Sequence, residues 1–123
     1  MYSRVSIKAA QALHRGQSYQ SANTRVADGV MWVNGTKVAW YDAGDTELRI
    51  TFGLGQPPAV IIDRLEAVLA VFGLPCHFQR AAHGAYHLLS RNLAYMEAAL
   101  LPGAAAAFNI KSGVFVGYRS IKE

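Results

Sequence analysis

The sequence predicts an α+β fold in which one main helix packs across an antiparallel meander sheet. Three observations lead to this prediction. The dipeptide Asn34-Gly35 joins two apolar segments, which is typical of a hairpin with a two-residue turn. Residues 47–52 alternate between apolar and polar side chains, as a half-buried strand does. Residues 59–72 carry apolar side chains at helical spacing, and a helix laid over a sheet buries the apolar surface of both.

The first segments predict a short N-terminal helix followed by polar chain. Residues 5–15 form an amphipathic pattern, in which Ser6 can act as the N-cap and Gly16 can close the C-terminus. Residues 19–26 are mixed and polar, so they fit either an edge strand or an ordered loop.

The hairpin at Asn34-Gly35 predicts which side chains share a face of the sheet. With a two-residue turn, one face carries Met31, Val33, Val38 and Trp40, and the other carries Val30, Trp32, Lys37, Ala39 and Tyr41. Residues 42–45 form the next turn. The following strand then points Leu48, Ile50 and Phe52 inward, and Glu47, Arg49 and Thr51 outward.

The main helix is expected over residues 59–72, after a segment rich in glycine and proline. Its apolar stripe is made of Ile61, Ile62, Leu65, Val68, Leu69 and Phe72, and its solvent side carries Asp63, Arg64 and Glu66. Residues 76–80 and 86–89 predict a second hairpin. A C-terminal helix is expected over residues 93–101, and a final hairpin within 108–121 around Ser112-Gly113.

Length and composition indicate one globular, cytoplasmic domain. The chain has 123 residues, of which 52% are hydrophobic and 16% charged, which argues against intrinsic disorder. We expect a single domain over residues 1–123, with a core at 5–89 and an extension at 90–123. No apolar stretch is long enough to predict a membrane span, and Arg4 and Lys8 stand where a signal peptide would be apolar. The single cysteine, Cys76, fits a reducing compartment.

The one cluster with ligand-type side chains is Cys76 with His77, His83 and His87. In the predicted hairpin, His77 and His87 point to opposite faces, so these side chains do not converge as zinc ligands must. We therefore predict no metal, no cofactor and no enzymatic activity. A small hydrolase or transferase that uses these three histidines is the alternative.

Charge and exposed aromatic side chains indicate a binding surface instead. The formal net charge is +4, from 12 Lys and Arg against 8 Asp and Glu. If the first helix begins at Arg4, then Arg4, Lys8 and Arg15 form one stripe that could follow a phosphate backbone. Aromatic side chains on the sheet face away from the main helix could meet a partner. The candidate contact residues are Arg4, Lys8, Arg15, Trp32, Lys37 and Tyr41.

Several short motifs occur in a recognisable order. They are Ile-Lys-Ala-Ala at 7–10, Ser-Ala-Asn-Thr-Arg-Val at 21–26, Met-Trp-Val-Asn-Gly-Thr-Lys-Val-Ala at 31–39, Leu-Arg-Ile at 48–50 and Arg-Leu-Glu-Ala-Val-Leu at 64–69. Over residues 5–89 this order resembles a group of small bacteriophage and prophage accessory proteins. The chain departs from their pattern at Ala22, where they carry glycine, at Leu54, where they carry tryptophan, and at residues 56–58, where they are rich in threonine.

The resemblance implies a phage-derived protein that binds a host protein or nucleoprotein complex. Small phage accessory proteins commonly bind host proteins, defence systems among them, so inhibition of a CRISPR effector is one implied activity. A small basic nucleic-acid-binding protein is the alternative that follows from charge alone. Association with a second copy of the chain is also left open by its high apolar content.

Overall fold

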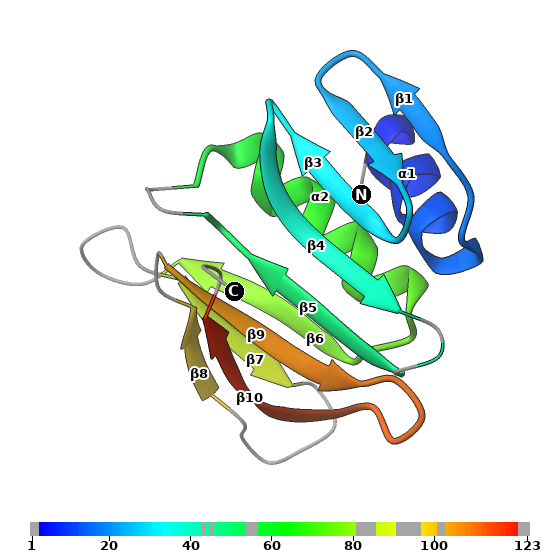
Figure 1. Ribbon diagram of the computed structural model, residues 1–123. Coiled ribbons are helices and arrows are strands. Elements are labelled where there is room, and N and C mark those ends of the chain that lie inside the picture. Colours follow the sequence, from blue (N-terminus) through cyan, green and yellow to red (C-terminus); the bar gives the residue numbers. More distant parts are fainter. Residues whose placement is uncertain are drawn as a thin grey trace.

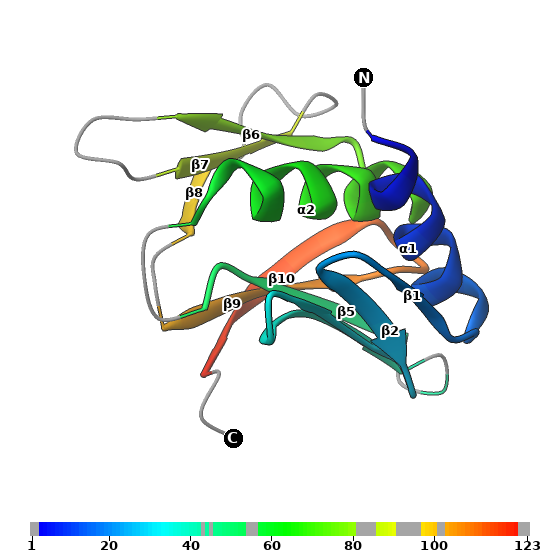
Figure 2. The ribbon, with the colours of Figure 1, turned by 90° about the horizontal axis from the view of Figure 1, so that it is seen from above.

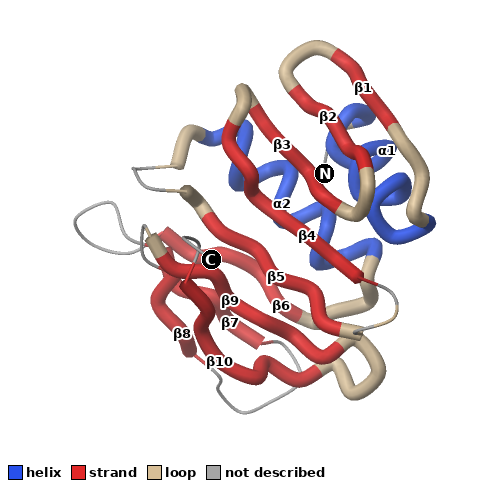
Figure 3. Tube along the Cα trace, viewed as in Figure 1, coloured by secondary structure: helices blue, strands red, loops and turns tan. Residues whose placement is uncertain are grey.

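The computed structural model describes residues 3–42, 44, 46–53, 57–80, 86–90, 97–100 and 103–120. Within these residues the chain forms two helices and ten strands, arranged as an α+β fold with two antiparallel sheets (Figures 1 and 3). No helix in this part of the chain combines the length and apolar character needed to cross a membrane.

The main sheet has seven strands in the order β1-β2-β3-β4-β5-β9-β10. Their bounds are β1 Tyr19–Ser21, β2 Thr24–Ala27, β3 Val30–Val33, β4 Thr36–Asp42, β5 Glu47–Thr51, β9 Ala104–Asn109 and β10 Val114–Ser120. The smaller sheet comprises β6 (Cys76–Arg80), β7 (Tyr86–Ser90) and β8 (Glu97–Leu100). The helices are α1 (Arg4–Arg15) and α2 (Ala59–Val71). Strands β3, β4 and β5 form the predicted meander, and β1 and β2 extend it by two strands.

The helices and the smaller sheet all lie on one side of the main sheet (Figure 2). We call this side the inner face. The core lies here, and its largest fully buried side chains include Leu13, Met31, Ile50, Leu65 and Phe108. We call the opposite side the outer face. No element within the described ranges covers it (Figure 2).

Two tight turns build the hairpins at the start of the meander. Asn34 and Gly35 have φ angles of 51° and 79°, which confirms the predicted turn. Asp28 and Gly29 form a second turn of the same kind, at 52° and 76°. Glycine is required at this second turn, because a Cβ on Gly29 would lie 2.5 Å from the carbonyl oxygen of Tyr41. The sequence left residues 19–26 open between an edge strand and a loop. In the structure they form β1 and most of β2.

Because of a β-bulge, the register between β3 and β4 differs from the predicted one. Trp32 pairs with Lys37, but Met31 pairs with Ala39, so Val38 is an extra residue in β4. Val38 and Ala39 are both fully buried, although neighbouring residues of a regular strand face opposite sides.

The bulge exchanges the faces of the residues that follow it. Trp40 lies on the outer face with Trp32, and Tyr41 lies on the inner face, where its ring contacts the Phe72 ring edge-on at 4.9 Å. The prediction that Trp40 shares a face with Val38, and Tyr41 with Trp32, is therefore wrong. A one-residue insertion in a strand reverses the side of every later residue.

The N-cap of helix α1 lies about one turn before the predicted N-cap. Its N-cap is Ser3, whose Oγ accepts a hydrogen bond from the backbone N–H of Ser6 at 3.1 Å. Ser6 lies inside the helix and is fully buried, so its predicted capping role is wrong. Gly16 closes the helix in the left-handed conformation, as predicted.

Helix α2 matches its predicted range closely, but one of its charged residues is not in solvent. Arg64 is only 6% exposed, because α1 packs against the side of α2 that the sequence pattern assigns to solvent. The prediction that Arg64 lies with Asp63 and Glu66 on a solvated side is therefore wrong for Arg64.

The C-terminal part differs most from the prediction. No helix covers the described part of residues 93–101, because Glu97–Leu100 form β8 and pair with β7; the rest of that range lies outside the described residues. The final hairpin around Ser112-Gly113 is confirmed by β9 and β10, but its first strand begins at Ala104, before the predicted range. Since β9 pairs with β5, residues 104–120 supply two strands of the main sheet.

Candidate binding face on the main sheet

The outer face carries both tryptophans of the chain, each stacked against a cation. Arg25, Trp32 and Lys37 are cross-strand neighbours on β2, β3 and β4. The guanidinium carbon of Arg25 lies 4.2 Å from the centre of the Trp32 ring, and Lys37 Nζ lies 4.4 Å from that of Trp40. Both distances favour attraction between the cation and the ring. We call these two contacts the cation–tryptophan pairs.

Further along the outer face, a carboxylate joins two arginines. Glu47 forms salt bridges with Arg49 and, at 3.2 Å, with Arg119. The hydrogen bond from Arg49 is the main reason why the pKa of Glu47 lies below its ordinary value. Glu47 therefore stays ionised, and its negative charge offsets part of the positive charge of the two arginines. Within the described residues, no carboxylate forms a salt bridge with Arg25 or Lys37.

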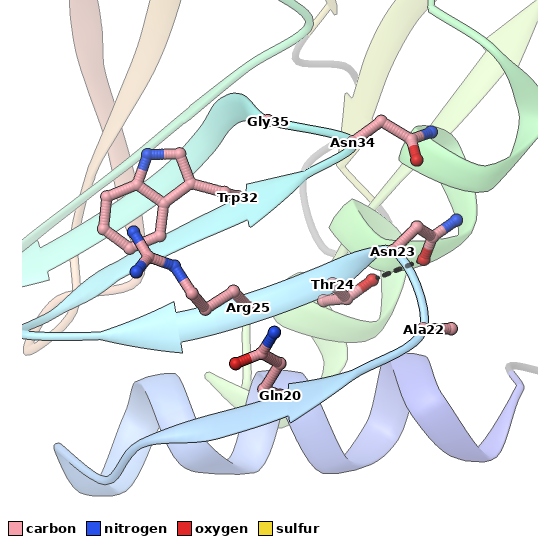
Figure 4. A pocket seen from close by; sticks show the side chains of 8 residues that line it. All are labelled: Gln20, Ala22, Asn23, Thr24, Arg25, Trp32, Asn34 and Gly35. Atoms are coloured by element: carbon pink, nitrogen blue, oxygen red, sulfur yellow. Dashed lines mark hydrogen bonds between the residues drawn. The ribbon is translucent and has the colours of Figure 1, made fainter.

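A groove of about 510 Å³ opens beside the Arg25–Trp32 pair (Figure 4). We call it the hairpin groove; its lining residues are Gln20, Ala22, Asn23, Thr24, Arg25, Trp32, Asn34 and Gly35. They come from β1, the β1–β2 turn, β2, β3 and the β3–β4 turn. The two turns are tied together, because the backbone N–H of Asn34 donates to the carbonyl oxygen of Asn23 at 2.8 Å.

Buried Arg64 supports the hairpin groove from below. Its Nε donates to Thr24 Oγ1 at 2.9 Å, and its Nη2 donates to Asn23 Oδ1 at 3.2 Å. On its other side, Nη1 donates to the hydroxyls of Ser6, at 2.6 Å, and Ser3, at 3.1 Å. One guanidinium therefore connects α2, the start of α1 and the β1–β2 turn.

Asp63 supplies the negative charge beside this arginine, with an oxygen 3.6 Å from Arg64 Nη1. Burial by itself raises the pKa of Asp63. Hydrogen bonds from the Ser6 hydroxyl and from Ser3, together with the charge of Arg64, outweigh that effect and lower the pKa below its ordinary value. The buried cation thus has an ionised partner, and each of its three nitrogens has at least one oxygen acceptor.

The structure places the predicted contact residues on different surfaces. Trp32 and Lys37 lie on the outer face. Tyr41 lies on the inner face, against Phe72. Three outer-face residues were not among the predicted ones: Arg25, Trp40 and Arg49. The Asp28-Gly29 turn could have placed Arg25 opposite Trp32, but no sequence signal marks the bulge that moves Trp40.

The predicted stripe on the first helix is also present. Helix α1 begins at Arg4, and the side chains of Arg4, Lys8 and Arg15 are all exposed. Since α1 lies on the inner side of the sheet, this stripe is separate from the outer face (Figure 2). The chain therefore offers two basic surfaces, which experiments can distinguish.

The histidine hairpin has a different register from the predicted one. His77 pairs with Leu89 and Gln79 pairs with His87, so His77 and His87 lie on the same face, and the prediction of opposite faces is wrong. His83 lies outside the described residues. Within the part of the chain that the structure describes, no three His, Cys, Asp or Glu side chains are grouped as metal ligands. Nearby Glu66 accepts a hydrogen bond from the backbone N–H of Phe78 at 3.0 Å.

The edge strand β10 is another exposed surface. Val114, Val116 and Tyr118 are each about half exposed, at 53%, 47% and 46%. A register shift beside Gly117, and a hydrogen bond from Arg119 to the carbonyl oxygen of Tyr118, both oppose pairing with a further strand. Association with a second copy stays a prediction, and the outer face is the stronger candidate surface.

In comparisons with known proteins, the chain matches no protein-family model, no curated protein and no solved structure.

Proposed function

We propose that this chain is a non-catalytic binding protein whose outer face binds single-stranded nucleic acid. The observation that carries the proposal is the presence of two cation–tryptophan pairs, Arg25–Trp32 and Lys37–Trp40, on a sheet face that no described element covers. Proteins that bind single strands combine cations for the phosphates with flat π surfaces for the bases.

Each part of a cation–tryptophan pair has a partner in a single strand. Arg25 and Lys37 are exposed and have no described carboxylate partner, so their charge is available to phosphates. Trp32 and Trp40 are half-buried, so part of each ring and the guanidinium of Arg25 can stack on bases. Stacking contributes about 1–3 kcal/mol per base. A duplex hides its base faces, which is why we propose single strands.

Tryptophan fluorescence tests the proposal directly, because Trp32 and Trp40 are the only two tryptophans and both lie on the outer face. We expect a single-stranded oligonucleotide to quench this fluorescence with saturation. The affinity should fall steeply as the salt concentration rises, because phosphate contacts release counterions. Absence of quenching at low salt would contradict the proposal.

Two charge-reversed double variants locate the binding surface. The first, Arg25→Glu with Lys37→Glu, changes the outer face, and the second, Lys8→Glu with Arg15→Glu, changes the α1 stripe by the same total charge. We expect the first to weaken binding about tenfold or more and the second much less. A larger loss in the second variant would assign binding to α1 instead.

A host protein or nucleoprotein complex is the second candidate partner, including a CRISPR effector as the resemblance to phage accessory proteins implies. Tryptophan and arginine are also the residues most enriched at the energetic centre of protein interfaces, and the outer face presents both. A pull-down from nuclease-treated bacterial lysate tests this candidate. A host protein that is retained by the wild type, but not by the outer-face variant, supports it; equal recovery with both contradicts it.

A further inference from the structure

We propose that Glu47 confines a bound single strand to the β2–β4 part of the outer face, because its carboxylate holds Arg49 and Arg119, which would otherwise extend the binding surface. This inference rests on the proposed function, since it assumes that a single strand reaches the outer face. It adds a residue that limits how far binding extends, and it identifies the two cations that this residue holds.

Cations and tryptophans of the outer face follow one another across neighbouring strands of the main sheet. The two cation–tryptophan pairs lie on β2, β3 and β4. Arg49 on β5 is the cross-strand partner of Trp40, so it lies directly beside the second pair. Beyond β5 come β9 and then β10, which carries Arg119 (Figure 1). By position alone, a nucleic acid that crosses β4 meets Arg49 next.

Arg119 belongs to the same surface, although it lies two strands beyond β5. It pairs with Ala105 of β9, which in turn pairs with Thr51 of β5, so all three residues lie on the outer face. A Cβ on Gly117 would lie 3.4 Å from Arg119 Nη1, which places the guanidinium beside this glycine. Arg119 Nη2 reaches Glu47 at 3.2 Å. The arginine therefore lies along the outer face and points toward β5.

The Glu47 carboxylate distinguishes these two arginines from the cations of the cation–tryptophan pairs. One of its oxygens accepts a hydrogen bond from Arg49, and the other accepts one from Arg119. A phosphate that binds either arginine must displace this carboxylate or approach it closely, and like charges repel. Within the described residues, no carboxylate forms a salt bridge with Arg25 or Lys37. The outer face therefore has one part with free cations and one part in which the cations are held.

Glu47→Gln tests this inference, because glutamine keeps the size of the side chain but removes its charge. For a single strand, each phosphate contact adds about 0.7 to the slope of log affinity against log salt concentration. Two released arginines should steepen this slope by about 1.4, so that a fourfold dilution of salt strengthens binding about sevenfold more than it does in the wild type. Titration with oligothymidine, followed by tryptophan fluorescence, measures the slope.

Asp28→Asn is the matched control for the change of charge. Asp28 is exposed in the β2–β3 turn, and asparagine tolerates its φ of 52°. We expect Asp28→Asn to keep a salt slope close to that of the wild type. The double variant Glu47→Gln with Arg49→Gln lacks one of the released arginines, so it should lose about half of the added slope. Circular dichroism establishes that each variant is folded.

Two single variants test the same inference with Glu47 in place. Arg49→Gln and Lys37→Gln each remove one positive charge, from neighbouring strands of the outer face. We expect Lys37→Gln to weaken oligothymidine binding about threefold or more at low salt, and Arg49→Gln to weaken it less than about twofold. The reason is that Lys37 is free to meet a phosphate, whereas Arg49 is held by Glu47.

The outcomes separate this inference from the proposed function. If the wild type shows no quenching at low salt, both fail. If the wild type binds, but Glu47→Gln keeps its slope or Arg49→Gln weakens binding as much as Lys37→Gln, the role of Glu47 is overturned and binding by the outer face stands. An equal steepening in Asp28→Asn overturns it too. A steeper slope in Glu47→Gln alone, partly lost in the double variant, supports the inference.

Discussion

Arg64 is the residue on which the arrangement of the N-terminal half depends. A buried guanidinium is costly unless its donors are satisfied, and here each of its three nitrogens has an oxygen partner: Thr24, Asn23, and the hydroxyls of Ser3 and Ser6. Asp63 adds the opposite charge. The same side chain therefore both stabilises the junction of the two helices and orients the Asn23 amide.

Replacing this arginine by an apolar residue should destabilise the protein strongly. Arg64→Met leaves the Asp63 carboxylate without the positive charge beside it, and the oxygens of Thr24 and Asn23 without their donor. We expect this to cost about 2–4 kcal/mol of unfolding free energy. Urea unfolding followed by tryptophan fluorescence measures this loss. Arg4→Met is the matched control, because Arg4 is exposed and should change stability by less than about 0.5 kcal/mol. Equal stability of the two variants would show that the buried network contributes little.

Sequence alone could not place Arg64 in the core. Its position on α2 fits the solvent side of the apolar stripe, and only the packing of α1 over that side buries it. The same limit applies to Asn23 and Thr24, which belong to a polar segment with no periodicity. Networks between distant segments depend on tertiary packing, and local patterns carry no information about it.

At the level of elements, hairpins with a strong turn signal were predictable. Asn34-Gly35 gave the correct pair of strands, and residues 47–52 gave both a correct strand and its inner side chains Leu48 and Ile50, which are fully buried. The bulge at Val38 was not predictable, because nothing in the sequence distinguishes a strand with an inserted residue. Glu97–Leu100 was predicted as helix, but pairing with β7 prevails over local preference.

The β1–β2 turn contains a residue that does not suit its conformation. Ala22 has a φ of 51°, in the left-handed region that costs a residue with a Cβ about 1 kcal/mol. Ala22→Gly should therefore stabilise the protein by about 0.5–1 kcal/mol and raise Tm by about 2–4 °C.

Thermal unfolding measures this effect, and Ala27→Gly is the control. Ala27 lies within β2 and has an ordinary strand conformation, so glycine there should lower Tm. A decrease of Tm in both variants would show that the conformation of Ala22 carries no strain.

For the whole molecule, the two basic surfaces lie on different sides of the main sheet. The α1 stripe, consisting of Arg4, Lys8 and Arg15, was predictable because helical periodicity gave it directly. The outer face was only partly predictable, since it depends on the bulge and on which side of the sheet the helices cover. Stacked aromatic groups distinguish the outer face from α1, where only charge is available.

Backbone amide shifts in NMR spectra can locate the surface that binds a single strand. On addition of oligothymidine, we expect the shifts to concentrate on β2, β3 and β4, around Arg25, Trp32 and Trp40, while α1 shows little change. Shifts concentrated on α1, or on the histidine hairpin β6–β7, would contradict the assignment of binding to the outer face.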